Sequence, residues 1–75
     1  MSMSPDTLSE IGFLLWGARW RLEMSKALMV NRVTINRWAS GRCRTPSYLP
    51  LRLVCLAVEA RRDAERAEQL ARQAG

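Results

Sequence analysis

Arginine and asparagine side chains recur on one side of a short predicted helix between residues 32 and 40. At about 100° per residue, five residues of this helix fall within an arc of roughly 140°. They are Arg32, Val33, Asn36, Arg37 and Ser40. Ile35 and Trp38 lie almost opposite. Guanidinium and carboxamide groups pair with the edges of guanine and adenine. The pattern therefore predicts a helix that buries one face and presents the other to duplex DNA.

The positive charge of the chain is concentrated around this predicted helix. Residues 1–18 carry a net charge of −2, residues 19–52 carry +7, and residues 53–75 are neutral, within an overall charge of +5. A general need for solubility would explain the total but not its concentration in the middle of the chain. A basic block at this place is typical of a surface that binds a polyanion.

Length and composition indicate one small domain without evident catalytic chemistry. A domain of 75 residues buries only about 60% of its unfolded surface, so we expect association to add stability. The sequence has no histidine, its acids are scattered, and neither Cys43 nor Cys55 has a general base that could activate its thiol. We therefore expect a non-enzymatic protein with no metal site and no cofactor, and we interpret Cys55 as a core residue. The first 17 residues lack the pattern of a signal peptide or membrane span, which favours a cytoplasmic location.

Hydrophobic residues recur at helical spacing in every long segment, so the predicted fold class is all-α. We expect a compact helix-turn-helix bundle of four or five helices with a long C-terminal helix. The first helix should begin after Ser4, which can cap it, with Pro5 at its first position. Its buried stripe is expected at Leu8, Ile11 and Leu15. The three tryptophans stand among leucines and isoleucines at helical spacing, so we interpret them as core residues rather than as platforms for bases.

Two shorter helices are expected on either side of a turn near residues 29–31. The first of these should end at residue 28 or 29, and its inward residues are expected to be Leu22, Ser25, Leu28 and Met29. Asn31 stands where an N-cap is needed, because its side-chain oxygen can accept a hydrogen bond from an unpaired amide of the next helix. Gly41 should end that next helix after Ser40.

The last helix is predicted to be too long for a domain of this size. It should begin between residues 47 and 51 and continue to about residue 73, a length of roughly 40 Å. Apolar residues recur along it close to a heptad, which predicts homodimerisation through Leu49, Leu53, Leu56 and Ala60. We therefore expect a helix-turn-helix DNA-binding domain over residues 1–60 and an extension of the last helix over residues 61–75. The alternative is a frayed or solvated tail without a partner.

The segment from Trp20 to Gly41 resembles the helix-turn-helix of the lambda-repressor-like family, the Cro/CI or xenobiotic-response-element type. The residues that carry the resemblance are Ser25, Leu28-Met29-Val30, Asn31, Ile35, Trp38 and the ending Trp38-Ala39-Ser40-Gly41-Arg42. The family usually has glycine in the turn, where this chain has Met29. Small repressors of phages and mobile elements, including those associated with anti-CRISPR genes, look similar in size and layout.

The resemblance implies a repressor that binds double-stranded DNA at a palindromic operator as a homodimer. Two copies of helix 32–40 would enter successive major grooves about 34 Å apart. Base contacts are then expected from Arg32, Val33, Asn36 and Arg37. Phosphate contacts are expected from Arg21, Lys26, Asn31, Thr34, Arg42 and Arg44.

Two other functions fit the same sequence. A protein-interaction module, such as an antitoxin or a phage factor that sequesters a partner protein, would use the long C-terminal helix. RNA binding would use the same basic surface. A partner that remains bound at high salt would favour the first alternative, and a preference for single-stranded RNA over duplex DNA would favour the second.

Overall fold

The computed structural model describes residues 3–75, and in that range it contains helices and no strands. The elements in chain order are α1 (Pro5–Trp16), the 3₁₀ turn η1 (Gly17–Arg19), α2 (Trp20–Leu28), α3 (Arg32–Ala39) and α4 (Leu49–Ala74). The predicted all-α class is therefore confirmed.

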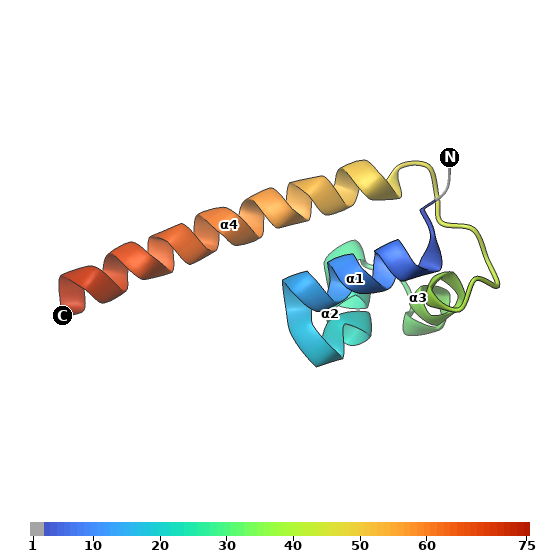
Figure 1. Ribbon diagram of the computed structural model, residues 1–75, viewed down its shortest axis with the longest axis horizontal. Helices are drawn as coiled ribbons and strands as arrows, with labels where there is room; N and C mark the ends of the chain where they lie inside the picture. The colour runs from blue at the N-terminus through green and yellow to red at the C-terminus, as the bar shows by residue number, and fades with distance from the viewer. Residues whose placement is uncertain (1–2) are drawn as a thin grey trace.

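The compact part of the molecule is a bundle of three helices, α1, α2 and α3, from which α4 extends (Figure 1). The expected compact bundle of four or five helices is thus corrected. The 26 residues of α4 span about 39 Å at 1.5 Å per residue, whereas the whole molecule measures 48 × 22 × 20 Å. A helix longer than the bundle is wide can bury only part of its length, and from Glu59 onward every residue is exposed.

The N-terminal helix follows the local rules read from its sequence. Ser4 has extended backbone angles, its hydroxyl oxygen accepts a hydrogen bond from the Thr7 N–H at 3.2 Å, and Pro5 occupies the first helical position. Leu8 is fully buried, and Ile11 is partly buried against the core. A further anchor joins this end of the chain to the loop before α4, because the Met3 N–H donates to Thr45 Oγ1 at 2.9 Å.

A close approach between α1 and α2 depends on Gly12. A Cβ atom at this position would lie 2.3 Å from the nearest ring carbon of Trp20, a distance that no packed pair of carbons adopts. Trp20 is only 7% exposed, so its ring has little room to move. The absence of a side chain at Gly12 is what lets the indole pack against the α1 backbone.

The core draws side chains from all four α-helices. Its fully buried members are Leu8, Met24, Ile35 and Leu49. Two tryptophans, Trp20 and Trp38, complete it together with Leu53 from the second turn of α4. The interpretation of the tryptophans as core residues is confirmed for these two, and Trp16 packs against the same cluster.

Two residues expected inside are on the surface. Met29 is 92% exposed, because it has left the α2 helix and adopts left-handed backbone angles. Cys55 is also exposed. It follows the buried Leu53 by two residues, which is about 200° around a helix and therefore on the opposite face.

Within residues 3–75, no helix combines the length and the hydrophobicity that a membrane crossing requires.

Candidate nucleic-acid interface

The turn between α2 and α3 is fixed at both ends by hydrogen bonds. The Met29 N–H donates to Lys26 O at 3.3 Å, and the Val30 N–H donates to Ser25 O at 3.0 Å. Met29 has φ 57° and ψ 41°, the left-handed region that usually favours glycine. The methionine therefore adopts the conformation that glycine commonly provides at this position.

The start of α3 is capped as the sequence predicts. Asn31 has extended backbone angles, and its Oδ1 accepts a hydrogen bond from the Val33 N–H at 2.8 Å. The Thr34 N–H bonds to Asn31 O at 2.9 Å. With only three residues between the helices, these bonds fix the direction in which α3 leaves α2.

The α3 helix divides into a buried and an exposed face. Ile35 is 0% exposed and Trp38 is 6% exposed, both within the core. On the other side, Arg32, Asn36 and Arg37 are exposed. The predicted division is confirmed: one face of α3 is anchored in the core and the other is exposed.

The exposed face of α3 borders two different hollows. The first has a volume of about 370 Å³ and is lined by Val33, Asn36, Arg37, Ser40 and Arg42. We call it the α3 hollow. It brings together three of the four expected base contacts, with Arg42 added from the following loop. The backbone N–H of Arg42 donates a hydrogen bond to the backbone carbonyl oxygen of Arg37 at 3.0 Å. This bond holds the start of the loop against the end of α3.

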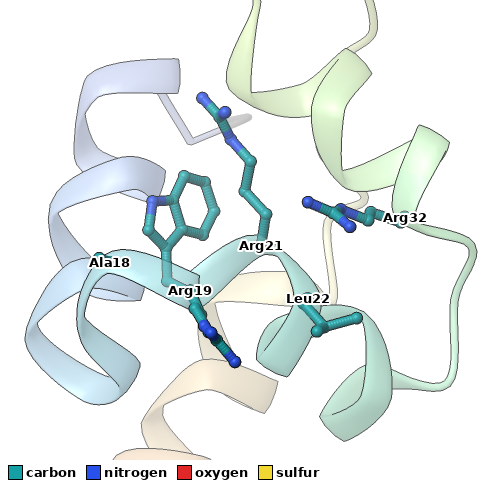
Figure 2. Close-up of a pocket in the computed structure, with 6 residues that line it drawn as sticks. Ala18, Arg19, Arg21, Leu22 and Arg32 are labelled. Carbon is teal, nitrogen blue, oxygen red and sulfur yellow. The ribbon is translucent and has the colours of Figure 1, made fainter.

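Arg32, the fourth expected base contact, lines a separate hollow of about 350 Å³ between α2 and α3 (Figure 2). We call it the α2–α3 hollow. Its residues are Ala18, Arg19, Trp20, Arg21, Leu22 and Arg32. Arg32 and Arg37 stand at opposite edges of the exposed arc of α3, about 140° apart, so they border different hollows.

Of the six expected phosphate contacts, Arg21 lines the α2–α3 hollow and Arg42 lines the α3 hollow, whereas the other four line neither. Arg21 and Arg32 share the α2–α3 hollow. Lys26 is exposed and lies 3.9 Å from a carboxylate oxygen of Glu23, a surface pair that contributes little to stability. Thr34 is half-buried, while Arg44 is exposed in the loop after α3.

Sequence reasoning gave no assigned role to Arg19, although it lines the same hollow as Arg21 and Arg32. Arg19 is the last residue of the 3₁₀ turn η1. Hydrophobic periodicity does not predict such a turn, so the side of the bundle on which Arg19 lies could not be inferred. The basic block between residues 19 and 52 was the only signal that included it.

The expected dimer contacts on α4 need correction. Leu49 and Leu53 are 0% and 2% exposed within the single protomer, so they belong to its core and offer no surface to a partner. Leu56 is partly buried against the same core, while Ala60 is exposed. Leu51, which is 70% exposed, and Val54, which is 56% exposed, lie on the other side of α4. Leu70, which is 48% exposed, lies further along the helix on the side of Leu56.

Residues 3–75 contain no group of three or more histidine, cysteine, aspartate or glutamate residues arranged to hold a metal ion. Cys43 and Cys55 are free and exposed.

Comparison with known proteins finds no match: no protein-family model matches the chain, and no curated protein or solved structure does so significantly. The residues and geometry of the chain itself therefore carry the functional argument.

Proposed function

We propose that this protein is a sequence-specific DNA-binding transcriptional regulator of the helix-turn-helix type, with α3 as its recognition helix. The observation that carries the proposal is the combination of an anchored α3, through Ile35 and Trp38, with an exposed face that bears arginine and asparagine. The major groove of B-DNA is about 12 Å wide and admits one α-helix.

The α3 hollow supplies chemistry that can distinguish bases. Arg37 can bond guanine O6 and N7, Asn36 can bond adenine N6 and N7, and Val33 can pack against a thymine methyl group. Each good bidentate pair contributes roughly 1–3 kcal/mol of discrimination against the wrong base. Val33 is 52% exposed, so its methyl groups are free to make an apolar contact in the complex.

The charge distribution supports binding to the DNA backbone around this helix. Residues 19–52, with a net charge of +7, include α2, the turn, α3 and the loop after it. Lys26, Arg42 and Arg44 are exposed within this block. Contacts of this kind position a protein on the duplex, release counterions and make affinity fall with salt.

We also propose that the protein forms a homodimer, in which the side of α4 opposite the buried Leu53 packs against a second copy of this chain. Leu51, Val54 and Val58 recur at spacings of three and four, which places them along one side of the helix. The sequence from residue 53 onward mixes four arginines with four acids and is neutral overall. Two copies can therefore approach along α4 without the repulsion that their basic blocks would cause. Two recognition helices would then read the two halves of a palindrome, and repression would follow from occupying DNA that a polymerase needs.

Selection of binding sites from random duplex DNA tests the proposed function. We expect enrichment of a palindromic sequence, and binding to it that weakens steeply as salt rises. Arg37→Ala and Asn36→Ala should each reduce the preference for the selected duplex over a scrambled one about 5- to 150-fold, which corresponds to 1–3 kcal/mol. Arg66→Ala is the matched control for Arg37→Ala, because it removes the same charge from an exposed site on α4. Failure to enrich any sequence would contradict the proposal.

A second candidate function is a protein-interaction module that sequesters a partner of another kind. It is favoured by the exposed apolar side chains of Tyr48, Leu51 and Val54 at the start of α4, which would suit a partner protein as well as a second copy. A heterologous protein that co-purifies at high salt, and is released by Leu51→Asp, would support this function. A purified chain that forms only a homodimer would count against it.

A further inference from the structure

Two arginines from different helices line the α2–α3 hollow. Figure 2 shows the Arg32 guanidinium directed toward the stem of the Arg21 side chain, whose own guanidinium extends away from Arg32, while Arg19 points away from both. Arg21 comes from the first turn of α2, and Arg32 is the first residue of α3. Because the intervening turn is fixed by the Met29 and Asn31 hydrogen bonds, the fold holds both arginines at the same hollow.

The pair carries two positive charges and no compensating acid. The residues that line the hollow include no aspartate or glutamate. Within residues 3–75, the ion pairs join Lys26 to Glu23 and Arg72 to Glu68, and no side-chain hydrogen bond engages Arg21 or Arg32. Two positive charges that line one hollow repel each other, and an anion bound between them would be attracted to both.

A buried aromatic ring supports one of the two guanidinium groups. The Arg21 guanidinium carbon lies 5.3 Å from the centroid of the Trp20 ring, within the range of a cation–π contact. Trp20 is itself held in the core against Gly12. Arg21 is therefore positioned before any ligand binds, which reduces the entropy lost on binding.

We propose that Arg21 and Arg32 together bind one phosphate of the DNA backbone, and that Arg32 does not read a base. This inference rests on the proposed function and changes one assignment made from the sequence. An arginine fork matches the oxygens of a phosphate and can bond it through two parallel N–H groups. Arg32 stands at the edge of the exposed arc that borders α2, where a helix inserted in the major groove meets the wall of the groove. Val33 and Asn36 lie in the middle of the arc and would face the floor of the major groove, where the base edges are exposed.

The two roles predict different results when Arg32 is removed. Phosphate contacts carry no sequence information of their own. Arg32→Ala should therefore weaken binding by a similar factor on every duplex and reduce the slope of log affinity against log salt by about one. Arg37→Ala should instead reduce discrimination at one base pair of each half-site.

Replacement of single DNA phosphates by uncharged methylphosphonates tests the proposal directly. The selected duplex is scanned one phosphate at a time against the wild type, the double variant Arg21→Ala/Arg32→Ala, and the control variant Arg66→Ala. One position in each half-site should weaken binding of the wild type and the control at least threefold, yet have no effect on the double variant. Arg32→Lys should keep the base preference of the wild type, because a lysine still attracts phosphate.

The outcomes separate the phosphate clamp from the proposed function. If the wild type selects a sequence and Arg32→Ala abolishes preference at one base pair, Arg32 reads a base and the clamp is wrong, although the function stands. If every methylphosphonate weakens the wild type and the double variant equally, the clamp is wrong as well. A wild type that prefers no duplex overturns the proposed function and the clamp with it.

Discussion

Substitution of Met29 by glycine should stabilise the protein, although methionine is the larger and more hydrophobic residue. Met29 has φ 57° and ψ 41°, and the left-handed region costs a residue with a Cβ atom about 1–2 kcal/mol. Glycine removes that strain but loses roughly 0.5–1 kcal/mol through the greater freedom of the unfolded chain. The side chain is 92% exposed, so almost no buried surface is lost. Taking the middle of each range, the net gain in the free energy of unfolding should be about 0.5–1 kcal/mol.

Thermal unfolding followed by far-UV circular dichroism measures this gain. For a domain of this size, 1 kcal/mol shifts Tm by roughly 4–8 °C, so we expect an increase of about 2–8 °C for Met29→Gly. Met29→Ala is the matched control, because it shortens the side chain and keeps the Cβ atom. Its Tm should stay near that of the wild type or fall slightly. A Met29→Gly protein no more stable than Met29→Ala would refute the assignment of a strained left-handed turn.

Three further substitutions test the packing that positions α3. Gly12→Ala should destabilise the protein by about 1–3 kcal/mol in urea unfolding, because the added methyl group would overlap the Trp20 ring; an unchanged midpoint would show that the two helices can separate freely. Asn31→Ala should lower the free energy of unfolding by about 1 kcal/mol through loss of the α3 cap, whereas Asn31→Asp, which still caps, should retain most of it. Leu53→Ala should cost about 2–5 kcal/mol in the same assay, while the exposed Leu51→Ala should leave protomer stability nearly unchanged and weaken self-association in sedimentation equilibrium. Equal stability losses for the two leucines would contradict the two-sided character of α4.

The features that sequence reasoning predicted correctly depend on short stretches of chain. Ser4 and Asn31 cap the helices that follow them, because an N-cap hydrogen bond joins residues only two or three positions apart. The division of α3 into the buried Ile35 and Trp38 and an exposed basic face follows in the same way from the helical period. The all-α class and the start of α4 within residues 47–51 were also accessible from local patterns.

The features that sequence reasoning missed depend on contacts between distant segments. The burial of Leu49 and Leu53 in the protomer depends on the packing of the start of α4 against the core. Gly12 is required because Trp20 lies against it, and nothing in the spacing of the two residues indicates that contact. Arg32 and Arg37 line different hollows because α2 lies beside only one edge of the exposed arc of α3. A helical wheel gives the arc that two residues share but not what stands at each edge of it.

The most direct test of the central claim is a methylation-interference experiment on the selected duplex with dimethyl sulfate. This reagent methylates guanine N7 in the major groove and adenine N3 in the minor groove, two positions that proteins reach from opposite sides of the base pair. If the exposed face of α3 reads DNA as proposed, methylated guanines should block binding in two clusters about one helical turn apart. Methylated adenines within those same clusters should have little effect. Interference confined to adenine N3, or none at all on a duplex that binds tightly, would contradict the placement of α3 in the major groove.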